Sequence, residues 1–159
     1  MTFSRRPLKK AGADLKPVGE VVSDRVWRAM IDASSLLSEL GIGHALVGGL
    51  AVGAHGWPRA TKDVDFLVDA TLSIRDDERH LQSAIDNAET SEGVPVAPVE
   101  AIVYMKLASP RSKDRMDVIE LIRAGLDVEK VRQYIDRVAP QLSDRFAEAV
   151  KTAVSEEDE

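Results

Sequence analysis

HALVGGLAVGAHGWPRATKDVDFLV, residues 44–68, is the stretch of the sequence that indicates the fold most strongly. It begins with a short run typical of a strand and passes through two glycines into an apolar run typical of a helix. It ends with residues that alternate polar and apolar side chains, as in a second strand. These features occupy residues 44–47, 48–49, 50–55 and 63–68. The order strand, turn, helix, strand predicts an α/β fold.

Apolar residues recur every three or four positions over most of the remaining sequence, which predicts helices. We expect Ser23 to cap a helix that ends near Gly41, and Asp127 to cap another. The other predicted elements are a helix at 72–88, a brief extended piece at 94–96, and helices that include 99–107, 116–122 and 142–150. The sequence therefore predicts an α/β (α+β) domain, with a short mixed sheet flanked by helices and a helical C-terminal half from about residue 98.

The composition is that of a single folded domain. The chain has 159 residues, of which 44% are hydrophobic, enough for one compact core. We expect residues 1–20 to form a flexible arm, residues 21–152 the domain, and residues 153–159 an acidic disordered tail. The absence of cysteine excludes disulfides and thiolate metal sites, and the net charge of −6 argues against a broad electrostatic grip on nucleic acid.

The sequence does not predict a membrane protein. No run approaches the roughly 20 apolar residues that a membrane-spanning helix needs. The basic segment at residues 1–10 is not followed by the apolar segment of a secretory signal. We therefore expect a cytoplasmic protein with no membrane partner.

Asp63 and Asp65 flank Val64 in the second predicted strand. Alternate side chains of a strand share one face and stand roughly 6–7 Å apart, so both carboxylates would project to the same side. Mg²⁺ bound between them would relieve their repulsion, because this ion prefers oxygen ligands. The alternative is a pair of exposed acids on a sheet surface, which is the common case for an isolated Asp-x-Asp.

Gly48 and Gly49 follow the first predicted strand and precede a helix. Glycine allows the backbone to approach a phosphate closely, and the start of a helix offers unpaired N–H groups. An ordinary tight turn is the alternative interpretation of this pair. If the two predicted strands are neighbours, the glycines and the two acids would lie within reach of one magnesium-bound triphosphate.

The run from Leu46 to Val68 resembles the signature of the DNA polymerase beta-type nucleotidyltransferase superfamily. In that signature a hydrophobic residue, Gly, and Gly or Ser are followed, after a spacer, by Asp-hydrophobic-Asp-hydrophobic. The similarity is greatest to the small prokaryotic branch of abortive-infection toxin and minimal nucleotidyltransferases, which His55, Gly56, Arg59 and Thr61 also match. A downstream helical segment of that branch, roughly Lys-Leu … Arg-x-Lys-Asp-x-x-Asp, resembles residues 99–117. The resemblance covers roughly residues 22–137.

The resemblance implies transfer of a nucleoside monophosphate from a nucleoside triphosphate to a hydroxyl of a protein, RNA or small molecule. It assigns the triphosphate to Gly48 and Gly49, one or two Mg²⁺ ions and catalysis to Asp63 and Asp65, and phosphate neutralisation to Arg59, Lys62 and Lys106. Each of these basic residues could instead be a surface charge or a structural ion-pair partner. The charged residues at 111–117 could likewise pair with one another, and His55 is either structural or a substrate contact.

The sequence departs from this family at a third carboxylate, which the family usually places on a later strand. Asp69 and Glu92 are the nearest candidates, and the spacing of neither suits that position. A second hypothesis is therefore a catalytically impaired member that acts by binding in a toxin–antitoxin-type system. A small helical partner protein would favour that role. Separately, the narrow sheet exposes an edge that pairing with another chain, such as a second copy, could cover. A third is a helical adaptor in which the glycines and acids are coincidental.

Overall fold

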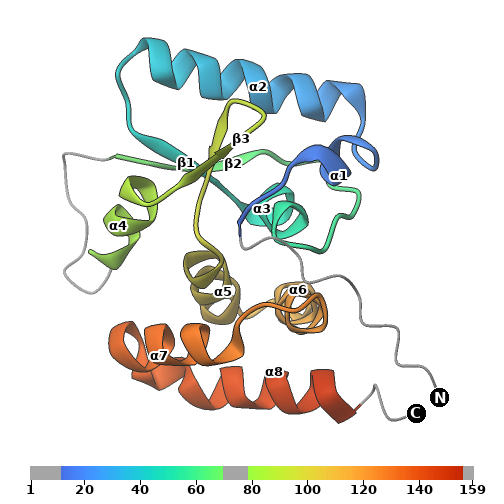
Figure 1. The fold of residues 1–159 in the computed structure, drawn as a ribbon, viewed down its shortest axis with the longest axis vertical. Helices are drawn as coiled ribbons and strands as arrows, with labels where there is room; N and C mark the ends of the chain where they lie inside the picture. The colour runs from blue at the N-terminus through green and yellow to red at the C-terminus, as the bar shows by residue number, and fades with distance from the viewer. Residues whose placement is uncertain (1–11, 70–78, 156–159) are drawn as a thin grey trace.

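A four-stranded mixed sheet forms within residues 12–69 and 79–155, the part of the chain that the computed structural model describes (Figure 1). The strands are β1 (His44–Val47), β2 (Asp65–Val68), β3 (Glu89–Ser91) and β4 (Val94–Val96). Their order across the sheet is β2-β1-β4-β3. Strand β1 runs antiparallel to β2 and parallel to β4, and β3 and β4 form an antiparallel hairpin.

Eight α-helices surround and extend this sheet within the described residues. They are α1 (Lys16–Gly19), α2 (Asp24–Glu39), α3 (Gly48–Ala54), α4 (His80–Asp86), α5 (Val99–Ala108), α6 (Ser112–Arg123), α7 (Val128–Val138) and α8 (Ser143–Ser155). Helix α2 crosses the top of Figure 1, and α5 to α8 gather on the opposite side of the sheet. The predicted short mixed sheet, flanking helices and helical C-terminal half are confirmed.

Strand β1 is the centre of the core. All four of its residues are buried, and Leu46 pairs with Phe66 on one side and with Val96 on the other. A strand that has neighbours on both edges and helices over the sheet carries a continuous apolar run, which explains the sequence of β1. Helix α2 covers this region with Val26, Met30 and Ser34, which recur every four residues along its buried face.

The helix starts follow the predicted caps. Ser23 Oγ accepts a hydrogen bond from the Val26 amide at 3.2 Å, and Asp127 Oδ1 accepts one from the Lys130 amide at 3.1 Å. The extended piece predicted at 94–96 is strand β4. Its partner β3 was not predicted, and the predicted helix at 72–88 is seen only as α4, since residues 70–78 lie outside the described residues.

Residues 12–20, expected in a mobile arm, instead pack against the domain. Leu15 and Val18 are fully buried, and the Asp14 amide donates to the Ala54 carbonyl at 2.9 Å. At the other end, α8 continues to Ser155 with Ala153 buried, three residues into the expected acidic tail. Residues 1–11 and 156–159 lie outside the described residues.

None of the helices within residues 12–69 and 79–155 combines the length and apolar character that crossing a lipid bilayer would require.

Candidate functional site

The glycine turn lies directly against the second strand. Val47, the last residue of β1, pairs with Asp65, the first residue of β2, because the two strands are antiparallel. Gly48 follows with a φ of +71°, a backbone conformation that side chains other than glycine rarely adopt. A Cβ at this position would lie 2.5 Å from Asp65 Oδ2. Glycine is therefore favoured by the backbone conformation, and a larger residue would in addition have to displace the Asp65 carboxylate.

Gly49 is enclosed by the loop that joins α3 to β2. A Cβ at this position would lie 3.2 Å from both Arg59 Nη2 and Thr61 Oγ1. These two residues were singled out in the sequence by the resemblance alone. Their contact with Gly49 shows that the loop folds back over the glycine turn, so that the turn, the loop and the start of β2 form one local unit.

The two acids differ in their positions. Asp65 begins β2, whereas Asp63 lies two residues earlier in the preceding loop, so the prediction that both belong to the strand is wrong for Asp63. Both are exposed, and neither forms an ion pair with any residue that the structure describes. Their carboxylates therefore carry charge that is not neutralised within the described chain.

A cavity of about 350 Å³ opens beside the glycine turn and Asp65. Strands β1 and β2 supply one wall of it, and α5, the α5–α6 turn and the start of α6 supply the other. Its lining residues are Val47, Gly48, Asp65, Phe66, Leu67, Ile102, Met105, Lys106, Ser109, Arg111 and Asp114. The structure thus brings together Gly48, Asp65 and Lys106, three residues that the sequence analysis placed at one site.

Arg59 and Lys106 belong to a buried ion-pair network. Arg59 binds Asp117 through two hydrogen bonds, of 2.9 Å from Nε and 2.8 Å from Nη2. Lys106 Nζ lies 2.9 Å from Asp117 Oδ2 and 2.8 Å from Asp114 Oδ1, and Arg111 Nε lies 2.8 Å from Asp114 Oδ2. Arg59 therefore ties the α3–β2 loop to α6, which is the role of a structural ion-pair partner that the sequence analysis left open for it. Lys106 forms ion pairs of the same kind and in addition lines the cavity.

Asp114 is held in its charged form by this network. Burial raises the pKa of its carboxyl, but hydrogen bonds from Lys106, Ser109 and Arg111 outweigh burial and lower the pKa to about 2. Its oxygens are used by these three donors, so Asp114 lines the cavity without serving as an unpaired third acid. The sequence signal for this residue was its helical spacing from Asp117, with Lys106 and Arg111 preceding it.

Lys62 and His55 do not line this cavity. Lys62 is exposed in the loop before β2, without an ion-pair partner among the described residues. His55 Nε2 donates to the Ala97 carbonyl at 2.7 Å, and burial lowers the pKa of its imidazole. His55 therefore ties the end of α3 to the end of β4. Of the two roles considered for it, structural residue or substrate contact, this is the structural one.

Neither candidate for a third carboxylate lies near Asp65. Asp69 follows the far end of β2, about 13 Å along the strand from Asp65, and its amide donates to the Gly43 carbonyl at 2.8 Å. Glu92 lies in the turn between β3 and β4. Because β4 is parallel to β1, this turn lies at the end of the sheet opposite Gly48. Within the described chain, no three acidic, histidine or cysteine side chains are grouped to hold a metal ion.

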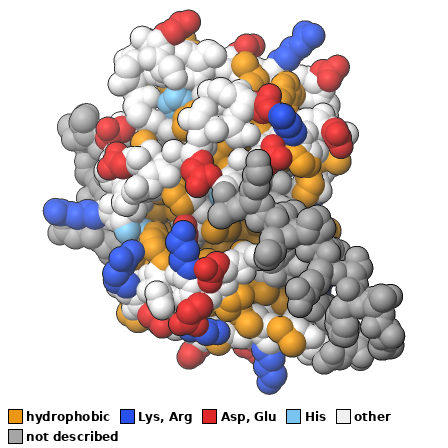
Figure 2. All heavy atoms as spheres, in the orientation of Figure 1, with side chains coloured by type: hydrophobic (Ala, Val, Ile, Leu, Met, Phe, Trp, Pro, Cys, Tyr) orange, Lys and Arg blue, Asp and Glu red, His pale blue; other side chains and the backbone are white. Residues whose placement is uncertain are grey.

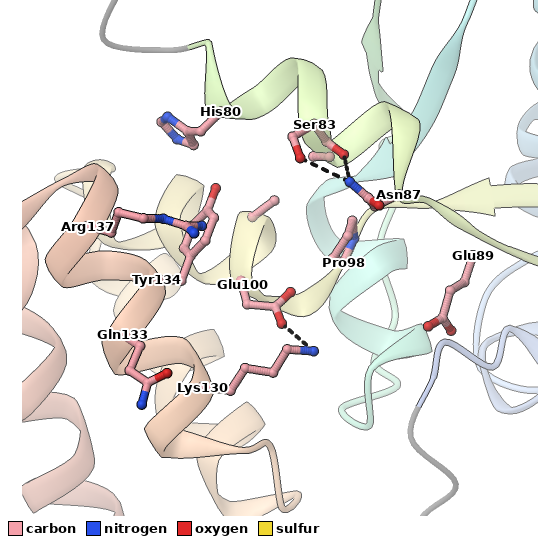
Figure 3. A pocket seen from close by; sticks show the side chains of 12 residues that line it. His80, Ser83, Asn87, Glu89, Pro98, Glu100, Lys130, Gln133, Tyr134 and Arg137 are labelled. Atoms are coloured by element: carbon pink, nitrogen blue, oxygen red, sulfur yellow. Dashed lines mark hydrogen bonds and ion pairs between the residues drawn. The ribbon is translucent and has the colours of Figure 1, made fainter.

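A larger cavity, of about 670 Å³, lies on another side of α5, between α4 and α7 (Figure 3). Glu100 and Lys130 form an ion pair of 2.9 Å inside it, with the Tyr134 ring nearby. Burial raises the pKa of the Tyr134 hydroxyl to about 12. This cavity contains neither the glycine turn nor the Asp63 and Asp65 pair, so it is separate from the site indicated by the sequence.

The chain matches no protein-family model, and a search of curated proteins found no match either. Its function is therefore inferred from the residues and contacts described above.

Proposed function

We propose that the chain binds a nucleoside triphosphate with Mg²⁺ in the cavity between Gly48, Asp65 and Lys106, and transfers a nucleoside monophosphate to a hydroxyl. The observation that carries this proposal is the contact between the glycine turn and the acid. Gly48 has a φ of +71°, and the space where a Cβ would stand is bounded by Asp65 Oδ2, 2.5 Å away. A bend without a side chain beside a carboxylate suits a phosphate that shares a cation with that carboxylate.

The two acids fit Mg²⁺. This ion usually keeps several waters and binds proteins through one or two carboxylates together with the phosphates of a substrate. Asp63 and Asp65 are exposed and unpaired within the described chain, so their oxygens are available as ligands. Bound there, the ion would supply neutralisation of the charge that develops on the transferring phosphoryl group.

The opposite wall of the cavity favours an anion. This wall contains two cations, Lys106 and Arg111, and only one carboxylate, Asp114, with which both form ion pairs. The wall that faces Asp65 therefore carries an excess of positive charge, which attracts phosphate oxygens. Lys106 is the member of this set for which a direct phosphate contact is proposed, since it is the predicted phosphate-binding cation that lines the cavity.

In the proposed reaction, a hydroxyl of a protein, RNA or small molecule attacks the α-phosphorus and pyrophosphate leaves. Donors fixed before the reaction stabilise the developing charge best, and the ion pairs of Lys106 hold its ammonium in place. The proton of the attacking hydroxyl needs an acceptor. Asp63 and Asp65 are the carboxylates of the proposed site that have no ion-pair partner among the described residues. We therefore assign the role of proton acceptor to this pair.

One observation favours a second candidate function, binding without efficient transfer. Asp114, the other carboxylate that lines the cavity, is already paired, and no group of three acids that could hold a metal ion is found within residues 12–69 and 79–155. A protein of this kind would act by holding a nucleotide or a partner protein, for example in a toxin–antitoxin-type pair. The two candidates differ in whether label passes from the nucleotide to an acceptor.

The test compares the natural chain with an Asp63→Asn/Asp65→Asn variant, with an Asp32→Asn variant as the matched control on the exposed face of α2. Each protein is incubated with Mg²⁺ and triphosphates labelled at the α-phosphate, and both nucleotide binding and transfer of label to protein or RNA are measured. Magnesium-dependent binding that is lost only in the double variant supports the site, and transfer lost with it supports the enzyme. Binding without transfer supports the second candidate, and nucleotide binding that survives in the double variant refutes the site.

A further inference from the structure

In addition to the two cavities described above, one of about 360 Å³ lies beside the proposed nucleotide site and is called the second cavity below, the nucleotide site being the first. It is formed by the α5–α6 turn, the first turn of α6 and one face of α8. Its lining residues are Lys106, Leu107, Ser109, Pro110, Arg111, Ser112, Arg115, Arg145 and Glu148. Lys106, Ser109 and Arg111 also line the first cavity, so the two cavities meet at these side chains.

The lining of this second cavity is strongly basic. Arg111 directly precedes α6, Arg115 lies in α6 and Arg145 lies in α8, whereas Glu148 is its one acidic lining residue. The whole chain, by contrast, has a net charge of −6. Three guanidinium groups around one cavity of an acidic protein indicate an anionic ligand, because arginine offers several N–H donors in the planar arrangement that suits phosphate.

Contacts within the protein hold two of the three arginines and leave donors free. Arg145 Nη1 donates to the Leu107 carbonyl at 3.0 Å, which ties α8 to the end of α5. Arg111 uses Nε for Asp114, and its side chain is 73% exposed. Arg115 forms no ion pair with any residue that the structure describes. Two of the three guanidinium groups are thus held in place, and most of the N–H donors of all three are still available.

Glu148 restricts the kind of anion. It lies one helical turn after Arg145 on α8, so a carboxylate stands among the three cations. A phosphate oxygen placed next to this carboxylate would be repelled by it, whereas a hydroxyl at the same place would donate a hydrogen bond to it. Ser109 and Ser112 add hydroxyls to the same lining. The combination suits a ligand with one phosphate and neighbouring hydroxyl groups.

We propose that this cavity binds a sugar-phosphate group, with the phosphate at Arg111, Arg115 and Arg145 and a sugar hydroxyl at Glu148. Its volume lies within the roughly 300–1,000 Å³ of small-molecule sites. The inference rests on the proposed function, because we take the sugar phosphate to be part of the molecule that receives the nucleoside monophosphate. The shared residues Lys106, Ser109 and Arg111 would then place that acceptor beside the triphosphate. Its source is either a free phosphorylated sugar or the backbone of an RNA.

The experiment measures binding of the full chain by nuclear magnetic resonance titration, without Mg²⁺ and without nucleotide. The probes are ribose 5-phosphate, inorganic phosphate, pyrophosphate and a short single-stranded RNA. Because no nucleotide is present, failure of this binding and failure of nucleotide binding are separate results. We expect ribose 5-phosphate to bind more tightly than either inorganic anion, and added salt to weaken its binding.

Two variants test the residues. We expect Arg115→Gln/Arg145→Gln to weaken ribose 5-phosphate binding about tenfold or more, since a hydrogen bond to a charged group contributes about that much. Lys151→Gln, which removes an exposed cation from the same helix, leaves binding unchanged. Arg115→Gln alone keeps the Arg145 contact with Leu107 and gives a smaller loss in a chain whose fold is intact.

The titration with RNA shows whether the sugar phosphate comes from an RNA backbone or from a free phosphorylated sugar. RNA binding that ribose 5-phosphate displaces, and that the double variant loses, assigns the cavity to a polynucleotide backbone. Binding of ribose 5-phosphate alone assigns it to a free phosphorylated sugar. The proposal is overturned if neither probe binds, if pyrophosphate binds more tightly than the sugar phosphate, or if the two arginine variants bind as well as the natural chain.

Discussion

Gly48 lies where β1 passes into α3. Its positive φ favours glycine, and the absence of a side chain also leaves room for the Asp65 carboxylate of the proposed site. Gly48→Ala combines a strained φ of +71° with a Cβ only 2.5 Å from Asp65 Oδ2. Gly41 has nearly the same φ, +70°, with no atom within 4 Å of a Cβ. We expect Gly41→Ala to cost about 1–2 kcal/mol of unfolding free energy from strain alone, and Gly48→Ala to cost on the order of 1–3 kcal/mol more from the clash.

Urea denaturation of the two variants measures this difference. Equal losses in the Gly41 and Gly48 variants would show that Asp65 moves away at no cost, and that the closeness of turn and acid does not constrain the site.

Asp117 is the residue on which the buried ion pairs converge. Asp117→Ala leaves the charges of Arg59 and Lys106 without this partner, and we expect a loss of about 3–5 kcal/mol, as is usual when one member of a buried pair is removed. Glu129→Ala, which breaks the exposed pair of α7 with Arg132, is the control, with an expected change of about 0–1 kcal/mol. Thermal and urea unfolding measure both, and a loss for Asp117→Ala as small as that of the control would contradict a buried network.

The depressed pKa of Asp114 predicts a dependence of stability on pH. The native pKa is about 2 and the ordinary value is 3.8, so the native state favours the ionised carboxyl. Its contribution is present above pH 4 and is lost as the pH falls toward 2. It amounts to about 2 kcal/mol, from roughly 1.4 kcal/mol per pKa unit. Unfolding free energies measured over this range in the natural chain and in Asp114→Asn check the effect, because only the natural chain should lose this amount.

At the scale of elements, α2 offers two serines for comparison, one that caps its start and one inside the helix. Ser23→Ala removes the side chain that accepts the Val26 amide, and we expect a loss of about 1 kcal/mol. Ser35→Ala, at an exposed position inside the same helix, should be neutral or slightly stabilising because alanine favours helix interiors. Thermal unfolding measures both, and a Ser23 variant that is no less stable than the Ser35 variant would show that the cap is not needed.

Elements with strong local signals could be predicted from the sequence, and those that depend on distant contacts could not. The caps at Ser23 and Asp127 and the apolar strand β1 were predictable because neighbouring residues define them. Strand β3 is three mostly polar residues that exist as a strand only through their pairing with β4. Helix α1 is likewise held by the burial of Val18, although the sequence around it is rich in lysine and proline.

In the candidate site, too, the features with a local sequence signal could be predicted and those that depend on distant contacts could not. The turn at Gly48 could be predicted because glycine pairs mark turns. Its closeness to Asp65 depended on which strands are neighbours, which the sequence does not state. The role of Arg59 could not be decided in advance, because a cation near two acids can serve a ligand or an ion pair. Its partner Asp117 is 58 residues away and is brought close only by the packing of α6.

At the scale of the whole molecule, the sheet region and the helical half share one hydrophobic core as well as the Arg59–Asp117 bond. Charged side chains of both signs are interspersed over the face in Figure 2, with no broad basic surface on that face. Recognition of an anion by this chain would therefore depend on local cavities and not on the overall charge.

The shared core predicts a single cooperative unfolding transition. Both tryptophans, Trp27 on α2 and Trp57 after α3, report on the sheet region, whereas circular dichroism reports on all helices. We expect urea denaturation to give the same midpoint by tryptophan fluorescence and by circular dichroism. Two separate midpoints would show that α5 to α8 unfold independently of the sheet.

The pairing of Val47 with Asp65 has a consequence for how such a chain can change over time. Hydrogen bonds between antiparallel strands keep these residues together, whatever number of residues the connecting loop contains. Insertions or deletions in the connection between α3 and β2 would thus be tolerated as long as the strands keep their register and Arg59, Thr61 and Asp63 keep their positions. Divergent descendants could then differ widely in the separation of the glycines and the acids along the chain and still present the same three-dimensional arrangement.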